Sequence, residues 1–268
     1  MSNLSALQIY VINLEGATKR RAHIEKSFAE AGITFQRVPA IDGKTFQWQP
    51  SDYSEGWYRC LHGREVNRPE VGCYLSHLQA LHTFLATEAH FALICEDDIS
   101  LESELPAVLS AAVTAPRFWN VLRLSGLSEG RSLRVNRLVG DSWVCLSLAR
   151  MKGTGAYLVD RKAARTLTHR LLPMKLPYDH ALDREWFYGL RAATILPFPI
   201  NQKQKRFGSS IQTYAQPKLS SWRRLLTTYP YQAFNESMRW LFRSAWFLAL
   251  KLRKAGSNHL PLPRLPFL

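Results

Sequence analysis

The stretch that decides the fold is FALICEDD, residues 91–98, in which five apolar residues run directly into three acidic ones. A short apolar run without Gly or Pro is typical of a strand that is buried on both faces of a parallel sheet. The carboxyl end of such a strand is where open α/β sheets bind ligands. Glu96, Asp97 and Asp98 repel one another there, and a divalent cation with a phosphate-bearing substrate would relieve the repulsion. The alternative is an acidic turn in which Asp98 or Ser100 caps a following helix.

A β-α-β unit is predicted at the start of the chain. Residues 7–14 are apolar and rich in β-branched side chains and predict a strand, residues 18–31 predict a helix, and residues 33–38 predict a second strand. The loop after the first strand has no glycine-rich fingerprint, which argues against a dinucleotide fold of the GxGxxG type. Arg20 or Arg21 in this region would suit a diphosphate, whereas the alternative places both on a solvated helix face.

A mostly buried helix is predicted over residues 70–88, where apolar side chains dominate. His77 and His82 lie on this helix, and three further residues raise the question of a zinc site: Cys60, His62 and Cys73. Because their spacings match no usual structural zinc motif, buried histidines with hydrogen-bond partners are the favoured interpretation.

A turn at residues 177–183 follows a predicted strand at residues 153–159 and opens a further helix. A carboxylate near a second substrate can take a proton from a hydroxyl group, which makes Asp179 a candidate general base. From spacing alone the alternative, in which Asp179 caps the helix, is favoured because a cap needs only local geometry. Residues 194–198 predict a last strand, and the prolines around it indicate a sheet edge.

The bulk properties fit a large domain with a basic appendage. The 268 residues suffice to bury a core, and 46% hydrophobic with 21% charged residues is ordinary for a globular protein. The four cysteines are scattered and no secretory signal is recognised at the start, so we expect a reducing, cytoplasmic setting. The net charge of +14 is uneven, because residues 201–268 hold 12 Lys and Arg against 1 acidic residue.

This charge asymmetry predicts contact with an anionic surface. Residues 201–217 predict a basic loop or lid, and residues 218–268 predict a basic amphipathic region. In residues 234–254 the apolar side chains gather on one side of a helix, and Arg239 and Arg243 lie toward the other. The apolar run is too short to span a bilayer, so we expect this helix to lie in a membrane interface. The alternatives are a helix packed on the domain with a solvated basic side, and nucleic-acid binding, against which the wide apolar face argues.

Five motifs follow one another in a characteristic order: VINL at 11–14 with the two arginines after it, VPAIDGK at 38–44, GCYLSH at 72–77, ICEDD at 94–98 and GTGAY at 153–157. In this order they resemble glycosyltransferase family 25, which includes the lipooligosaccharide galactosyltransferases of Gram-negative bacteria. The resemblance covers roughly residues 7–215.

The resemblance implies an α/β fold of the GT-A type, with a Rossmann-like mixed sheet flanked by helices over residues 1–200 and the basic amphipathic helical region as an extension. In such a fold the acidic motif holds Mn²⁺ or Mg²⁺ against a nucleotide-sugar diphosphate, and the implied metal ligands are Glu96 and Asp98. Asp179 is similar to the family's acidic position after the Gly-Thr-Gly strand and is implied as general base. The residues implied to bind the donor are Ile12, Asn13, Leu14, Arg20, Arg21, Ser76, His77 and Asp97.

The implied reaction transfers a hexose, with UDP-galactose as the donor that the family favours, to a lipooligosaccharide, another glycolipid or an oligosaccharide, with inversion of configuration. If the acceptor is held in the membrane, we expect the basic region to bring the enzyme to anionic headgroups at the cytoplasmic face of the inner membrane. No nucleic-acid partner is expected. Two alternatives stay open, namely a catalytically silent member of the same fold and a non-catalytic basic binding module.

Overall fold

The parallel half of the sheet forms around the predicted β-α-β unit. β1 (Leu7–Asn13) pairs in parallel with β2 (Gln36–Pro39) on one side and with β3 (Phe91–Glu96) on the other, and α1 (Thr18–Glu30) connects β1 to β2. The carboxyl ends of β1 and β3 therefore lie at the same edge of the sheet. Asp97 and Asp98 follow Glu96, the last residue of β3, at this edge.

This computed structural model describes residues 6–202 and 216–254, so that the predicted lid at 201–217 lies almost wholly outside the described residues. The further strands of the described chain are β4 (Ile99–Leu101), β5 (Val121–Arg123), β6 (Ser132–Arg137), β7 (Trp143–Ser147), β8 (Ala156–Asp160), β9 (Ala192–Leu196) and β10 (Ile200–Gln202). The large sheet has the order β2-β1-β3-β8-β5-β9-β7-β6, and β10 pairs with β4 in a small second sheet. β8 is antiparallel to β3 and β5, whereas β9 is parallel to β5, so the large sheet is mixed.

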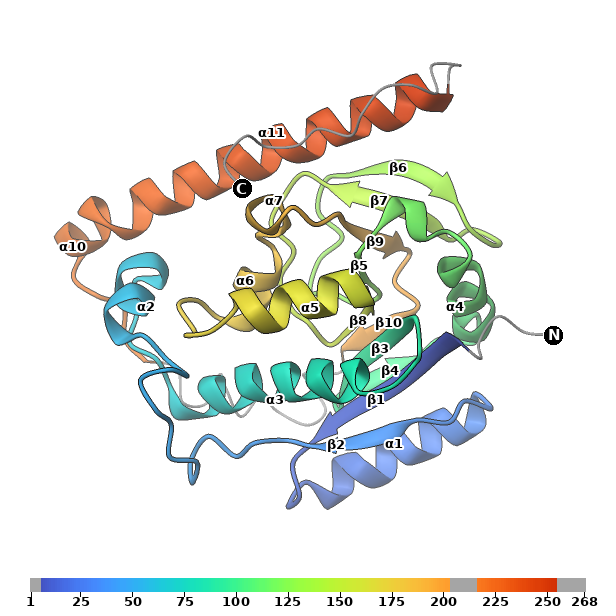
Figure 1. Ribbon diagram of the computed structural model, residues 1–268, viewed down its shortest axis with the longest axis horizontal. Coiled ribbons are helices and arrows are strands. Elements are labelled where there is room, and N and C mark those ends of the chain that lie inside the picture. Colours follow the sequence, from blue (N-terminus) through green and yellow to red (C-terminus); the bar gives the residue numbers. More distant parts are fainter. Residues whose placement is uncertain (1–5, 203–215, 255–268) are drawn as a thin grey trace.

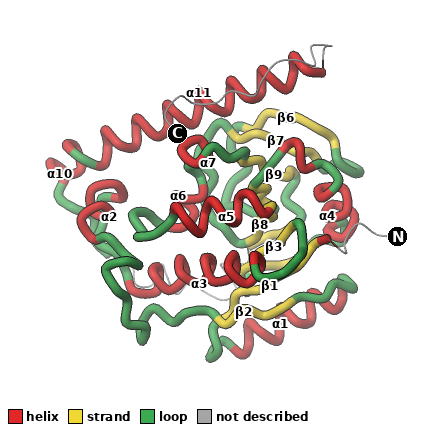
Figure 2. The backbone as a smooth tube through the Cα atoms, viewed as in Figure 1, coloured by secondary structure: helices red, strands yellow, loops and turns green. Residues whose placement is uncertain are grey.

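Helices cover both faces of the large sheet (Figures 1 and 2). α3 (Arg68–Leu85) and α5 (Arg161–Arg170) pack on one face, and α1 and α4 (Leu105–Val113) pack on the other, so that one apolar cluster is buried on each face. The predicted α/β class with a mixed sheet flanked by helices is confirmed. Shorter helices complete this part of the chain: α2 (Glu55–His62), the 3-10 helix η2 (Pro116–Phe118), α6 (Tyr178–Leu182) and α7 (Glu185–Tyr188).

Two local interpretations of the sequence are contradicted. β9, the strand predicted at an edge, lies between β5 and β7, and Pro197 and Pro199 follow its last paired residue without removing a bond from the ladder. The acidic residues also do not lead into a helix capped by Asp98 or Ser100. They lead into β4, and α4 begins only after Glu104, which makes no side-chain cap.

α10 (Ser221–Leu226) and α11 (Thr228–Lys254) form the C-terminal part of the described chain. α11 runs along one side of the sheet domain, next to α2, α7 and the β6–β7 hairpin (Figure 1). Its inner face buries Phe242 and Trp246 against the domain. None of the helices in the described ranges combines the length and the hydropathy that a membrane span requires. The boundary between a domain at 1–200 and a C-terminal region at 218–268 stays a prediction.

Buried ion pairs attach α11 to the sheet domain. Arg243 is 2% exposed and lies 2.9 Å from Asp183 and 2.5 Å from Glu185, and it donates to the Ser147 carbonyl oxygen at 2.6 Å. Arg239 is fully buried and lies 3.0 Å from Asp183. The expectation that these two arginines face outward is therefore wrong, because helical spacing does not reveal carboxylates that the fold brings in from a distant segment.

Candidate active site at the carboxyl ends of the parallel strands

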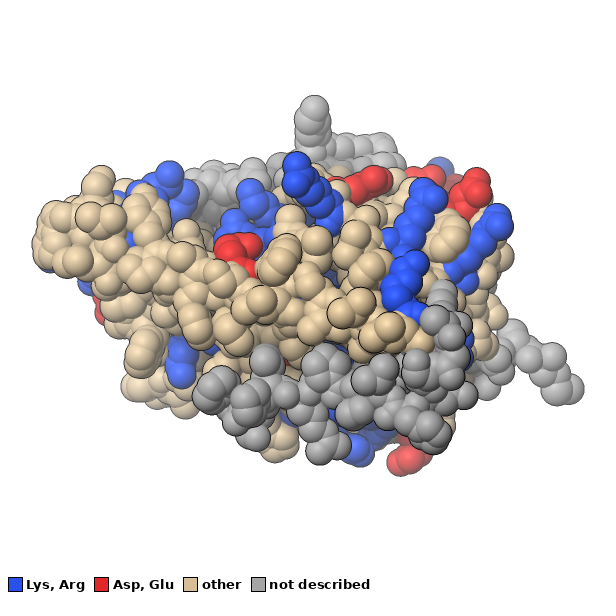
Figure 3. Space-filling model, turned by 90° about the horizontal axis from the view of Figure 1, so that it is seen from above, with Lys and Arg blue, Asp and Glu red and all other residues tan. Residues whose placement is uncertain are grey.

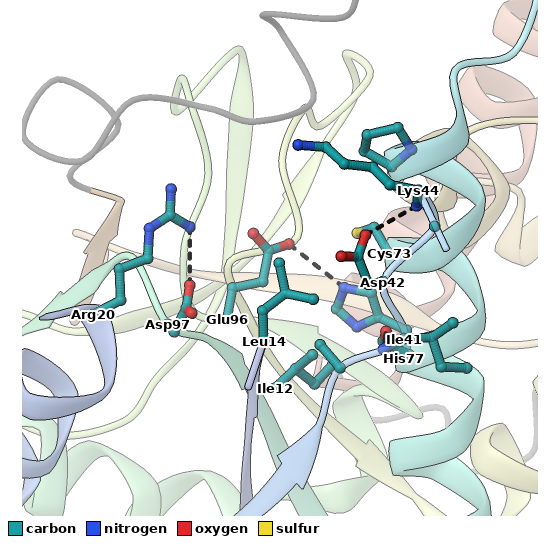
Figure 4. A pocket seen from close by; sticks show the side chains of 14 residues that line it. Ile12, Leu14, Arg20, Ile41, Asp42, Lys44, Cys73, His77, Glu96 and Asp97 are labelled. Atoms are coloured by element: carbon teal, nitrogen blue, oxygen red, sulfur yellow. Dashed lines mark hydrogen bonds and ion pairs between the residues drawn. The ribbon is translucent and has the colours of Figure 1, made fainter. Parts of the chain in front are cut away.

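A cavity of about 160 Å³ opens at the carboxyl ends of β1 and β3. Ile12 and Leu14 reach it from β1 and the loop after it, Arg20 from α1, and Glu96 and Asp97 from the end of β3 (Figure 4). The other lining residues come from α3 and the segments before it: Ala40, Ile41, Asp42, Gly43, Lys44, Pro69, Cys73, Ser76 and His77. The fold thus brings acidic and basic side chains together from segments that are far apart in the sequence.

Asp97 is held at this cavity by two side chains. Asn13 Nδ2 donates to Asp97 Oδ2 at 2.7 Å. Arg20 Nη1 donates to Asp97 Oδ1 at 3.1 Å (Figure 4). Burial raises the pKa of Asp97, although the hydrogen bond from Asn13 and the charge of Arg20 act in the opposite direction. Arg37 donates to Asn13 Oδ1 at 3.1 Å and fixes the orientation of the amide. Asn13 therefore positions Asp97 and does not itself line the cavity.

Glu96 faces His77 across the cavity. Glu96 Oε1 lies 3.5 Å from His77 Nε2, and the Thr154 hydroxyl donates to the same carboxylate oxygen at 3.3 Å (Figure 4). His77 is fully buried, its Nδ1 lies 3.1 Å from the Tyr157 hydroxyl, and its ring stacks on Tyr178 at 4.1 Å. Nε2 makes no hydrogen bond to the described residues and has the Glu96 carboxylate in front of it, so a ligand between the two groups could contact both.

Cys73 completes a group of side chains that suits a metal ion. Its sulfur, a ring nitrogen of His77 and a carboxylate oxygen of Glu96 all lie within 4.8 Å of one another. Burial and the charge of Glu96 raise the pKa of the Cys73 thiol well above its ordinary value. A thiol, an imidazole and a carboxylate fit a borderline cation better than Mg²⁺, which prefers oxygen ligands throughout.

Asp98, the second predicted metal ligand, is not among the residues that line this cavity. It is buried, and its Oδ1 has no hydrogen-bond partner in the described part of the chain. Burial and the charge of Glu96 raise the pKa of Asp98 to about 7. Of the two predicted metal ligands, the structure therefore brings Glu96 alone into the group with Cys73 and His77.

The loop between β2 and α2 docks on α3 through two glycines. A Cβ atom on Gly72 would lie 2.4 Å from the Ile41 carbonyl oxygen, and a Cβ atom on Gly43 would lie 1.9 Å from the Arg68 carbonyl oxygen. The Ser76 hydroxyl accepts a hydrogen bond from the Ile41 N–H at 2.8 Å. Two of the family-like motifs, VPAIDGK and GCYLSH, thus form one packed unit that holds the charged end of the loop over the cavity.

We expect Gly72→Ala to lower the free energy of unfolding by about 1–3 kcal/mol, because backbone atoms of the docked loop would have to move to admit the methyl group. Thermal unfolding of the variant measures this effect. The matched control is Gly56→Ala in α2, where an added Cβ meets no atom within 4 Å and the helix gains propensity. Equal losses of stability in the two variants would contradict the close approach of the loop to α3.

Asp179 lies in the first turn of α6, next to the GTG segment, and is not among the residues that line the cavity. Its two carboxylate oxygens accept hydrogen bonds from the Gly153 N–H at 3.2 Å and the His180 N–H at 2.9 Å. Burial raises the pKa of Asp179, but the His180 ring, the Gly153 N–H and Arg123 outweigh it, so the pKa is lowered overall. The helix is preceded by Pro177 as its N-cap, which contradicts the alternative of Asp179 as the cap.

Arg21, one of the predicted donor-binding residues, lies outside the cavity lining and pairs with Glu25 at 2.9 Å on the surface of α1. Two charged lining residues, Asp42 and Lys44, were not singled out by the sequence. The Lys44 N–H donates to the Asp42 carboxylate at 2.9 Å (Figure 4). Both residues belong to the VPAIDGK motif, which could have pointed to them. Nothing in the spacing of that motif shows that its loop lies close to the acidic residues at the end of β3.

Comparison with known sequences identifies a family for this chain. Residues 6–182 match the model described as Glycosyltransferase family 25 (LPS biosynthesis protein). A glycosyltransferase 25 family member of Anopheles gambiae is 34% identical over 108 residues, which cover 37% of this chain and 18% of the relative. Procollagen galactosyltransferase 1-A of Xenopus laevis is 28% identical over 130 residues, which cover 44% of this chain and 21% of the relative. The matched stretch therefore spans about a fifth of the length of these relatives.

Solved structures show a weaker likeness, which carries no functional argument. A glycosyltransferase involved in the glycosylation of the major capsid of PBCV-1 has a TM-score of 0.43 at 10% identity, covering 78% of this chain and 96% of that one. A mutant Drosophila β-1,4-galactosyltransferase 7, in complex with manganese, UDP-Gal and xylobiose, has a TM-score of 0.42 at 9% identity, covering 82% of this chain and 78% of that one. Because the family model spans well over half of the sequence, the protein belongs to glycosyltransferase family 25.

Proposed function

We propose that the protein is a hexosyltransferase that takes its sugar from a nucleotide-sugar donor, with UDP-galactose as the preferred candidate. The observation that carries the proposal is the cavity at the carboxyl ends of β1 and β3, where Glu96 and Asp97 lie together with Arg20 and Lys44. Guanidinium and ammonium groups suit the oxygens of a diphosphate, and carboxylates suit a cation that a diphosphate also binds. This combination supports a donor whose charged end lies in the cavity.

A divalent cation belongs to this proposal, with Mn²⁺ or Mg²⁺ as the candidates. His77 Nε2, the Glu96 carboxylate and the Cys73 thiol are the groups that would hold it. His77 Nε2 supports this assignment, because it is buried, makes no hydrogen bond to the described residues and faces the Glu96 carboxylate, and a buried polar atom that makes no hydrogen bond is costly unless a ligand uses it. When bound, the cation supplies positive charge that stabilises the departing diphosphate.

Asp179 is the proposed general base. Its lowered pKa keeps it a carboxylate at neutral pH, and Arg123 fixes the backbone around it by donating to the carbonyl oxygens of Gly153 and Asp179 at 2.6 and 3.1 Å. The acceptor hydroxyl passes its proton to Asp179 while its oxygen forms a bond to the anomeric carbon. The bond between that carbon and the diphosphate oxygen breaks, and the electron pair leaves with the nucleotide. A single displacement of this kind inverts the configuration.

The proposed acceptor is a lipooligosaccharide, another glycolipid or an oligosaccharide at the cytoplasmic face of the inner membrane.

A melting-temperature screen against nucleotide sugars, with and without Mn²⁺, tests the proposal. A ligand that binds the native state alone raises the melting temperature, and the increase grows with the logarithm of its concentration relative to its Kd. We expect UDP-galactose with Mn²⁺ to give the largest increase. If no nucleotide sugar raises the melting temperature while DNA or heparin does, the protein is a basic binding module instead.

We expect His77→Ala to weaken Mn²⁺ binding by about tenfold or more, because it removes one of the three donor groups. Isothermal titration calorimetry of Mn²⁺ into the protein measures this without any need for activity. His82→Ala is the matched control, since His82 lies on the same helix but is exposed. Equal Mn²⁺ affinity in both variants would place the cation elsewhere.

A further inference from the structure

α10 and α11 expose an apolar surface that faces away from the sheet domain. Nine of the 14 large hydrophobic side chains exposed in the described chain lie on these two helices. We refer to six of them, each between 53% and 70% exposed, as the C-terminal ridge: Trp222, Leu225, Leu226, Trp240, Leu241 and Leu248. Soluble monomers rarely expose so many large apolar side chains on two successive helices unless that surface binds something.

The ridge is fixed in its outward orientation. Phe242 and Trp246 occupy the opposite side of α11 and are buried in the domain, and Arg239 and Arg243 bind buried carboxylates on that same side. Rotation of the helix to hide the ridge would expose these apolar side chains and break the buried ion pairs, which is costly. The apolar surface is therefore a permanent feature of the folded chain.

Positive charges border the ridge. Arg223 lies 5.3 Å from the ring of Trp222, and Arg224 lies 4.8 Å from the ring of Tyr229, which is itself exposed. The space-filling view from above shows a band without Lys or Arg, with Lys and Arg beside it (Figure 3). The acidic residue of α11, Glu236, is neutralised by an ion pair with Arg239. The surroundings of the ridge are thus basic.

We propose that the C-terminal ridge inserts into the interfacial layer of a membrane that contains anionic lipids. Aromatic and aliphatic side chains bordered by Arg and Lys are the composition of helices that lie in the plane of such an interface. A second copy of this chain is a poorer occupant, because pairing two ridges would bring like charges together. Nucleic acid is also a poorer occupant, because it offers no apolar groove for a ridge of this length. The proposal does not depend on the transfer reaction.

Vesicle flotation of the protein distinguishes apolar insertion of the ridge from a purely electrostatic attachment. We expect the protein to float with vesicles of equal parts phosphatidylglycerol and phosphatidylcholine, and to be retained in part at high salt because apolar insertion is not screened. Trp240→Ser combined with Leu241→Ser is expected to weaken binding by about a hundredfold, since each substitution removes an inserted side chain worth about tenfold.

Trp57→Ser is the matched control, because Trp57 is 57% exposed, close to the 53% of Trp240, but lies on α2. It is expected to leave flotation unchanged. Far-ultraviolet circular dichroism and the melting temperature verify that each variant is folded. We expect both variants to fold, because the substituted side chains are exposed. The proposal is overturned if the full chain does not bind these vesicles, if the double variant binds as well as the parent, or if the ridge substitutions abolish self-association in place of lipid binding.

Discussion

Glu96→Gln is expected to reduce sugar transfer from the nucleotide-sugar donor by about a hundredfold or more, the range in which the loss of one group that stabilises developing charge falls. The substitution keeps the size of the side chain and removes its charge, so that Glu96 no longer offers a carboxylate opposite His77, 3.5 Å from its Nε2. Initial rates of transfer or of donor hydrolysis, at saturating Mn²⁺ and with the melting temperature verified, measure the effect.

Two companion variants make this test specific. Glu104→Gln changes an exposed carboxylate in the segment after β4 and is expected to keep full activity. Asp98→Asn changes a carboxylate that is buried beside the cavity but outside its lining, so we expect a smaller loss than for Glu96→Gln. Full activity of Glu96→Gln, or a larger loss in Asp98→Asn, would contradict the assignment of Glu96 to the cation.

The second large effect is expected from Arg243→Met, which should destabilise the fold by about 3–5 kcal/mol, because removing one partner leaves buried charges uncompensated. Glu185 would lose its cation entirely, whereas Asp183 would keep Arg239 at 3.0 Å. For a chain of this size the expected fall in melting temperature is about 10 °C, and differential scanning calorimetry measures it.

The control for this variant is Arg137→Met, which removes an exposed pair with Asp141 and is expected to cost at most about 1 kcal/mol. Adding Glu185→Gln to Arg243→Met should restore part of the lost stability, since it removes the orphaned charge. If the single variant melts within a degree of the parent protein, the buried cluster does not hold α11 in place.

The sequence predicts the elements whose signals are local. The apolar run of β3 and the β-α-β unit at residues 7–39 depend on short-range periodicity, and the structure contains both close to the predicted bounds. The edge position predicted for β9 failed because Pro197 acts as a breaker only after the strand has ended. The outward orientation predicted for Arg243 failed because its partners come from a segment that no periodic pattern in α11 can reveal.

The residues of the candidate site likewise include some with a local sequence signal and some whose position depends on distant segments of the chain. Glu96 and Asp97 could be predicted, because a strand with acidic residues at its carboxyl end is visible in the sequence itself. Lys44 could not be predicted as a lining residue, since its position depends on the packing of Gly72 against Ile41 in the folded chain. The group of Cys73, His77 and Glu96 could not be predicted, because Glu96 lies on β3 and the spacing of residues along α3 does not show that it lies close to them.

Arg123 links the proposed general base to the C-terminal helix. It binds the backbone of Asp179 at 3.1 Å and approaches the Asp183 carboxylate at 3.9 Å, and Asp183 in turn binds the arginines of α11. The turn that carries Asp179 is thereby connected through buried charges to the helix that bears the C-terminal ridge. An enzyme resting on lipid by that ridge would hold its reaction centre at a constant height above the bilayer, and acceptor chains would be selected by how far they protrude.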